Sequence, residues 1–245
     1  MSDHPDEGYI TEIKQRTNEL IRPPIANINQ AIIVCSISKP AFSSLLLDQF
    51  LVLFESKKIQ PVIFISKADK ITDTDGVKSY MDAYENIGYD VELFSVKGDC
   101  DLARLTHYFT DKVSVIAGQS GVGKSSMLNA LDHTLFLKTD EVSERLGRGK
   151  HTTRHVELLD VFGGFVADTP GFSSLDFRDI AVEELASCFP EIDALKNKCR
   201  FRGCNHYKEP NCAVKEAVKS GSIMSFRYEH YVRFYEEFKN RKPRY

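Results

Sequence analysis

The sequence has no long hydrophobic run, few cysteines and no secretion signal. Its longest apolar stretch, Leu45 to Phe54, is interrupted by Asp48 and Gln49, which excludes a membrane-spanning helix of about 20 apolar residues. Six cysteines in 245 residues are too few for a disulfide scaffold. The first residues are polar and acidic, without the apolar core of a signal peptide. We therefore expect a soluble, cytoplasmic protein with no membrane partner.

The composition is that of an ordinary globular protein, but its charge is unevenly distributed. Hydrophobic residues make up 42% and charged residues 27%, which argues against a disordered, collagen-like or coiled-coil chain. The net charge is −3, yet residues 196–245 hold 13 Lys and Arg against 5 Asp and Glu. A basic C-terminal segment on an acidic body indicates an anionic partner, or else a solvated helix face that has none.

Short apolar runs alternate with segments of helical periodicity through the first two thirds of the chain. Short apolar runs predict buried parallel strands at 31–35, 61–65, 91–94 and 113–117. Apolar residues at helical spacing predict helices at 42–56, 77–87 and 102–108, and a hairpin is predicted from 155–159 and 164–167. This order predicts an α/β fold with a doubly wound, mostly parallel sheet.

The strand patterns end at Phe177, and a domain boundary is expected near residue 178. Helices are predicted at 182–189 and 225–239. The second helix carries an aromatic stripe from Phe226 to Phe238, which favours a core position over stacking on nucleic-acid bases.

The strongest motif is a glycine-rich loop between a predicted strand and a predicted helix. Gly118 to Ser125 matches GxxxxGKS, and the strand–loop–helix context predicts a P-loop. Lys124 would reach the β- and γ-phosphates, and Ser125 would bind Mg²⁺. The residues expected to contact nucleotide here are Gly118, Gln119, Ser120, Gly121, Val122, Gly123, Lys124, Ser125 and Ser126.

Two later segments resemble the switch elements of GTPases. Asp168-Thr-Pro-Gly171 ends the predicted hairpin, where Asp168 would hold Mg²⁺ through water and the Gly171 N–H would contact the γ-phosphate. In the basic loop before it, Thr153 is expected to complete the Mg²⁺ coordination, with Thr152 as the alternative. Phe172 stands where Ras-like GTPases carry the water-orienting glutamine, so His151 is the candidate catalytic residue, or else a structural or partner-facing loop histidine.

A base-recognition element lies upstream of the P-loop. Ser66-Lys67-Ala68-Asp69 resembles the Asn-Lys-x-Asp element of GTPases and follows the strand at 61–65. Asp69 would accept from both guanine donors, which adenine lacks, and Lys67 would lay its alkyl stem over the base. Ser95-Val96-Lys97 resembles the loop whose backbone contacts guanine O6. The motif order is therefore a circular permutation of the usual GTPase.

The C-terminal segment holds three cysteines and a histidine at close spacing. Cys199, Cys204, His206 and Cys212 offer a closed tetrahedral set for one structural Zn²⁺, the alternative being three free thiols. Basic residues surround the set and suit contacts with RNA phosphates. They are Arg200, Arg202, Lys208, Lys215, Lys219 and Arg227.

Together these motifs resemble the RsgA family, also called YjeQ or YloQ, which comprises bacterial circularly permuted GTPases of late small-subunit maturation. The resemblance implies slow GTP hydrolysis to GDP and phosphate, stimulated by the small (30S) ribosomal subunit, and binding to 16S rRNA. It divides the chain into 1–24, a remnant of an OB-fold whose remainder is absent, 25–177, the GTPase domain, and 178–245, the zinc-binding domain. Tyr9 to Ile13 would be the last OB-fold strand. We expect a monomer.

Two other functions are compatible with parts of this pattern. One is a nucleotide-dependent switch that docks a protein partner through its zinc module, away from the ribosome. The other is a P-loop kinase or ATPase. Asp69 argues against this function, because adenine offers no donor pair that matches its carboxylate.

Overall fold

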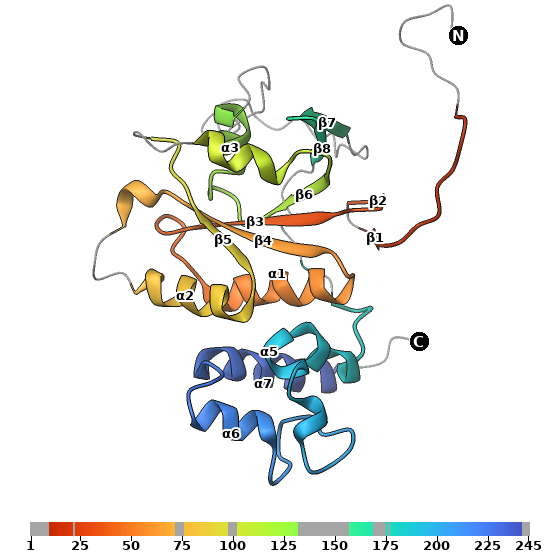
Figure 1. The fold of residues 1–245 in the computed structure, drawn as a ribbon, viewed down its shortest axis with the longest axis vertical. Coiled ribbons are helices and arrows are strands. Elements are labelled where there is room, and N and C mark those ends of the chain that lie inside the picture. The colour runs from red at the N-terminus through yellow and green to blue at the C-terminus, as the bar shows by residue number, and fades with distance from the viewer. Residues whose placement is uncertain are drawn as a thin grey trace, which may run out of the picture.

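The centre of the molecule is a six-stranded sheet with the strand order β5-β4-β3-β6-β8-β7 (Figure 1). The computed structural model describes residues 10–21, 23–71, 76–97, 102–131, 157–168, 175 and 177–241. All neighbouring strands are parallel except β7, which is antiparallel to β8. The strands are β3 (Gln30–Ser36), β4 (Gln60–Ser66), β5 (Asp90–Leu93), β6 (Val113–Ala117), β7 (Glu157–Val161) and β8 (Gly164–Asp168).

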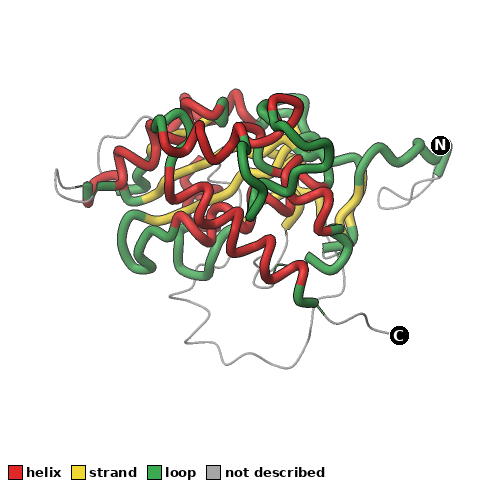
Figure 2. The backbone as a smooth tube through the Cα atoms, turned by 90° about the horizontal axis from the view of Figure 1, so that it is seen from below, coloured by secondary structure: helices red, strands yellow, loops and turns green. Residues whose placement is uncertain are grey.

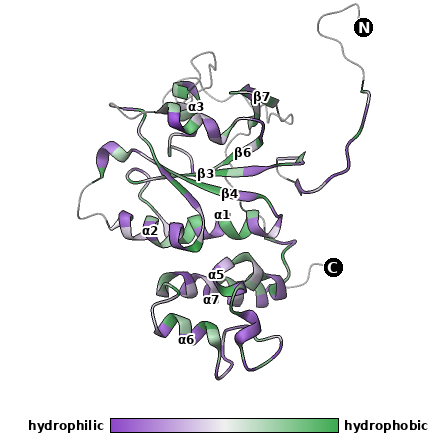
Figure 3. Ribbon diagram, viewed as in Figure 1, coloured by the Kyte–Doolittle hydropathy of each residue, from purple (hydrophilic) through white to green (hydrophobic). Residues whose placement is uncertain are grey.

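Helical segments cover both faces of the sheet, as the alternating pattern predicts. On one face lie α1 (Ser44–Ser56) and α2 (Val77–Ile87), which share a hydrophobic cluster with β3 and β4. On the other lie η2 (Leu102–Tyr108) and α3 (Lys124–Leu131), packed in a second cluster. Figure 3 shows the central strands β3, β4 and β6 as hydrophobic ribbons between helices of mixed character. The doubly wound fold is confirmed.

The predicted elements differ from the structure mainly at helix type and helix ends. The segments at 102–108 and 182–188 are 3₁₀ helices, with i to i+3 bonds such as Glu184 N–H to the Ala181 carbonyl at 3.1 Å. Helix α1 begins at Ser44, later than predicted, because the Ser43 hydroxyl caps it by accepting from the Leu46 N–H.

The N-terminal arm is extended but forms no strand at the predicted place. Residues 10–16 extend away from the sheet in both views (Figures 1 and 2), and Ile10 and Ile13 are 87% and 89% exposed. The strand predicted at 9–13 is therefore wrong over 10–13, since the described part of the chain offers these residues no neighbouring strand to bond. Residue 9 lies outside the described residues. A short hairpin follows instead, of β1 (Glu19–Leu20) and β2 (Ile25–Ala26).

The C-terminal part packs helices around a core of its own, on the α1 side of the sheet (Figure 1). Tyr231, Phe234, Tyr235 and Phe238 are all buried, so the prediction that the aromatic stripe is core is confirmed. Among the described residues, no helix has the length and apolarity to cross a membrane. The helices are η3 (Val182–Cys188), α5 (Pro190–Asp193), η4 (Lys196–Lys198), α6 (Ala213–Lys219) and α7 (Ser225–Lys239).

Candidate functional site

The glycine-rich loop joins β6 to α3 and is fixed at the carboxyl end of the sheet. Gly118 has φ +139°, and a Cβ there would lie 2.2 Å from the Val34 carbonyl oxygen. Only glycine fits this position. Val122, 2% exposed, anchors the loop in the core. The loop is therefore held just before α3, whose first N–H groups have no partner within the helix.

The lysine of this loop folds back over the loop backbone. Lys124 Nζ donates to the carbonyl oxygens of Gly118 at 2.9 Å and Gln119 at 2.7 Å. Ser125 and Ser126 follow in the first turn of α3 and are half-buried. The motif thus brings an ammonium group, two hydroxyls and a helix N-terminus to one place, which is the chemistry of a phosphate-binding site.

The predicted base element contacts the glycine-rich loop directly. Ser66, the last residue of β4, is 2% exposed and donates its hydroxyl to the Val122 carbonyl at 2.6 Å. Lys67 follows in the left-handed conformation with φ 62°. Its Nζ donates to Gly121 O at 3.0 Å. Residues distant in sequence are thereby held as one surface, with β4 and β6 both reaching the same edge of the sheet.

The same ammonium group also fixes the loop that follows β3. Lys67 Nζ donates to the carbonyl oxygens of Ser38 at 3.2 Å and Lys39 at 2.6 Å. Partial burial lowers the pKa of this amine from its ordinary value. The contact with the Ser38 and Lys39 carbonyls is not predictable from the sequence, because carbonyl groups carry no sequence signal. This loop also has a left-handed Lys39, with φ 49°, and a cis peptide bond before Pro40.

Asp69 stands exposed beside Ser95. Its carboxylate accepts from the Ser95 hydroxyl at 2.5 Å, and this hydrogen bond lowers the pKa of Asp69 from its ordinary value. The Ser95 oxygen in turn accepts from the Lys97 N–H at 3.1 Å, and the Ala68 N–H donates to the Phe94 carbonyl at 3.1 Å. The segments at 66–69 and 95–97, predicted to share one function, therefore do lie together.

The predicted switch residues lie largely outside the described part of the chain. Asp168 is the last residue of β8, whose Ala167 pairs with Val115 of the neighbouring β6. The backbone of Asp168 is thus at the same sheet edge as the glycine-rich loop. His151, Thr152, Thr153 and Gly171 lie outside the described residues.

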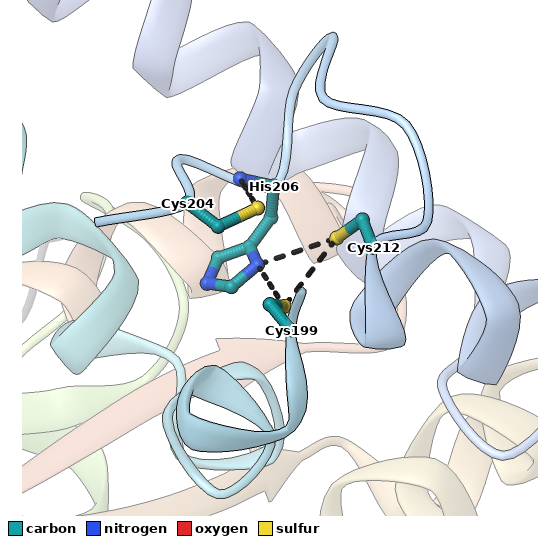
Figure 4. A group of neighbouring side chains, drawn as sticks. All are labelled: Cys199, Cys204, His206 and Cys212. Atoms are coloured by element: carbon teal, nitrogen blue, oxygen red, sulfur yellow. Dashed lines mark hydrogen bonds between the residues drawn. The ribbon is translucent and has the colours of Figure 1, made fainter. Parts of the chain in front are cut away.

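The three cysteines and the histidine converge at one point in the C-terminal part (Figure 4). Cys199 Sγ lies 3.8 Å from Cys212 Sγ, and His206 Nδ1 lies 3.4 Å from each of these sulfurs. A tetrahedral zinc site has sulfur–sulfur and sulfur–nitrogen edges of about 3.8 Å and about 3.6 Å, from its bond lengths. With Cys204, the donor atoms all lie within 4.8 Å of one another. The cluster could hold one metal ion, bound by the histidine through Nδ1.

The loop that presents these ligands is held by hydrogen bonds from both sides. The Tyr231 hydroxyl donates to Asn205 O at 2.6 Å and the Tyr228 hydroxyl to His206 O at 2.8 Å. Glu209 accepts from the N–H groups of Asn205 and Tyr207. Burial lowers the pKa of the His206 imidazole, which favours the neutral form that binds metals.

Burial acts on the Cys204 thiol in the opposite direction. It raises the pKa of Cys204 to about 12, which favours the protonated thiol. A divalent cation reverses this preference by displacing the proton. The donor set and its spacing therefore suit a structural cation with soft ligands.

One basic residue predicted to face RNA does not do so. Arg227 is 0% exposed and binds the carboxylates of Asp48 and Glu191, so this prediction is wrong. Arg227 is buried because it lies on the face of α7 that packs into the core. A count of charges along the sequence cannot show which face a residue occupies. Arg200, Arg202, Lys208 and Lys219 are exposed, and Lys215 is half-buried.

The fold and the glycine-rich loop define the class of P-loop nucleotide-binding α/β proteins. A family model described as RsgA GTPase matches residues 13–178. The chain therefore belongs to the RsgA GTPase family, and this membership implies the chemistry of GTP hydrolysis.

Individual relatives are similar over nearly the whole chain. The small ribosomal subunit biogenesis GTPase RsgA 2 of Oceanobacillus iheyensis is 61% identical over 98% of this chain and 83% of its own length. The small ribosomal subunit biogenesis GTPase RsgA of Bacillus subtilis is 58% identical, over 98% of this chain and 81% of that protein.

Two solved structures share the fold. YloQ, a circularly permuted GTPase, superposes with a TM-score of 0.83 and 50% identity, over 100% of this chain and 79% of that one. YjeQ from Thermotoga maritima gives a TM-score of 0.83 with 38% identity, over 94% of this chain and 78% of that one. The predicted circular permutation is thereby confirmed at the level of the fold.

Proposed function

We propose that this chain is a GTP hydrolase of small ribosomal subunit biogenesis, which docks on 16S rRNA and is stimulated by the small subunit. The names of its relatives support the biological role. The observation that carries the chemistry is the bond from Lys67 Nζ to the Gly121 carbonyl, since it joins the base element to the glycine-rich loop.

Guanine selection rests on Asp69. One carboxylate oxygen accepts from Ser95, and the exposed carboxylate would accept from guanine N1–H and N2–H₂. Its lowered pKa keeps it ionised at neutral pH. The alkyl stem of Lys67, whose ammonium is fixed by three carbonyl oxygens, would cover one face of the base. Ser66, Ala68, Val96 and Lys97 would complete the pocket with backbone groups.

The phosphates would lie in the loop from Gly118 to Ser126. Lys124 would exchange its bonds to the loop carbonyls for bonds to the β- and γ-phosphates. The N–H of Gly171 would contact the γ-phosphate, and His151 would orient the attacking water. On this account, His151→Ala abolishes subunit-stimulated turnover and leaves GTP binding unchanged.

Two metal ions complete the proposal. Ser125 and Thr153 would bind Mg²⁺ directly and Asp168 through water, which suits a hard cation that prefers oxygen ligands. Bound Mg²⁺ would neutralise charge developing on the phosphates. Zn²⁺ would bind Cys199, Cys204, His206 and Cys212 as a structural ion, because all four ligand positions belong to the protein.

The basic C-terminal segment would supply the contact with RNA. We propose residues 25–177 as the GTPase domain and 178–245 as the zinc module. Exposed cations on a metal-fixed loop would neutralise phosphates, so binding would weaken steeply with salt. The chain would work as a monomer in the cytoplasm.

The test is GTP hydrolysis with and without purified small ribosomal subunits. Large subunits and ATP serve as controls. We expect stimulation by small subunits alone and with GTP alone. Equal turnover with and without small subunits, in a chain that binds GTP, would contradict the ribosomal role.

A further inference from the structure

A cavity of about 520 Å³ opens at the metal cluster, outside the nucleotide site, and the candidate ligands Cys199, Cys204 and His206 form part of its wall. Its volume falls in the range of small-molecule sites. It is lined on one side by η3 and on the other by the loop that carries the metal ligands. The family's nucleotide chemistry gives this cavity no role.

An exposed aromatic ring stands at this cavity. Phe201 lines it and is 44% exposed, although the rest of the aromatic side chains in this part are mostly core. The guanidinium of Arg200 lies 5.7 Å from the centre of the Phe201 ring. An exposed ring next to an arginine is the usual platform on which proteins stack an unpaired base.

The cavity also offers groups for the edge and the backbone of a nucleotide. Asn197 and Asn205 line it and carry amide donors and acceptors, and Glu183 carries a carboxylate acceptor. Arg202 lines it as well. Residues 196–208 contain five Lys and Arg and no Asp or Glu. The rim therefore attracts a polyanion and repels a basic partner.

The walls are already fixed before any ligand binds. Asn205 is held through its carbonyl by Tyr231 and through its N–H by Glu209. The cysteines on either side of Phe201 and Arg202, Cys199 and Cys204, belong to the metal cluster. A preformed site loses little conformational entropy on binding.

We propose that this cavity receives one unstacked base of single-stranded RNA, stacked on Phe201, with its phosphates against Arg200 and Arg202. This rests on the proposed function and deepens it. The metal cluster would then fix the loop that presents the Phe201 ring to the base.

The test uses the zinc-loaded full chain and a single-stranded oligouridine dodecamer that carries one 2-aminopurine, because uridines stack weakly and leave this base fluorescent in the free RNA. Stacking quenches the fluorescence of this base, so the signal reports the contact and not only the affinity. We expect quenching by the unaltered chain, loss of quenching in Phe201→Ala with affinity reduced about 5- to 150-fold, and recovery in Phe201→Trp. The matched control is Phe165→Ala, because Phe165 on β8 is 46% exposed and does not line the cavity.

Equal quenching and affinity in Phe201→Ala and the unaltered chain would overturn the proposal. The proposal would also be overturned if Phe201→Ala lost affinity for small subunits but bound the dodecamer normally. That result would indicate that the cavity receives a protein side chain and not an RNA base. Small-subunit binding by the unaltered chain is measured in parallel. Absence of small-subunit binding would reject the proposed function, whereas quenching and affinity with the dodecamer test the base-stacking cavity separately.

Discussion

Arg227 on α7 donates to Asp48 on α1, and both side chains are 0% exposed. The guanidinium also forms two bonds to Glu191, at 2.7 and 3.2 Å. Asp48 accepts in addition from Tyr84 on α2 at 2.6 Å and contacts His230 Nδ1 at 2.6 Å. A buried ionic network thus connects α1 and α2, which cover one face of the sheet, to the C-terminal part of the chain that holds the metal cluster.

Removing one partner of this network leaves a buried charge unpaired. We expect Arg227→Met to lower the free energy of unfolding by about 3–5 kcal/mol, measured by urea denaturation. Arg233→Ala on the same helix is the control, because Arg233 is exposed. A change below about 1 kcal/mol in Arg227→Met would show that the network contributes little.

The Lys67 ammonium stabilises the nucleotide site before nucleotide binds. Lys67→Met keeps most of the alkyl stem and removes the bonds to Ser38, Lys39 and Gly121. We expect GTP affinity to fall about 10- to 100-fold in equilibrium binding, the range for hydrogen bonds of a charged group. Lys70→Met, an exposed lysine three residues on, should bind GTP normally; an equal loss in both variants would refute a specific role for Lys67.

The metal cluster should contain one zinc ion per chain, measurable by elemental analysis. Cys204→Ser removes one soft ligand and should reduce both the zinc content and the thermal stability of the C-terminal part. Cys35→Ala is the control, since Cys35 lies in β3 away from the cluster. Retention of stoichiometric zinc in Cys204→Ser would mean that Cys204 is not a ligand.

Contiguous motifs were the part of the site that the sequence alone could define. Gly118 to Ser125 carries its function in local backbone geometry, so its pattern predicts its structure. The bonds from Ser66 to Val122 and from Lys67 to Gly121 join residues more than 50 positions apart. Such contacts depend on which strands become neighbours in the sheet, and periodicity does not define that order.

The same distinction explains the two wrong predictions. Tyr9 to Ile13 has the composition of a strand, but a strand also needs a neighbour, and residues 10–13 have none among the residues that the structure describes. Arg227 is one of several cations in a basic segment, yet only the packing of α7 against α1 shows that its partners are carboxylates. Both errors arise because tertiary context, and not the local pattern, decides the structure: a missing strand neighbour in the first case and buried carboxylate partners in the second.

The most direct test of the account is nucleotide selection by Asp69. Asp69→Asn replaces one acceptor with a donor, which matches xanthine, whose C2 carbonyl stands where guanine has an amino group. We expect this variant to lose small-subunit-stimulated GTP hydrolysis by at least 100-fold and to hydrolyse XTP under the same conditions. Unchanged GTP hydrolysis in Asp69→Asn would contradict the assignment of Ser66 to Asp69 as the guanine site.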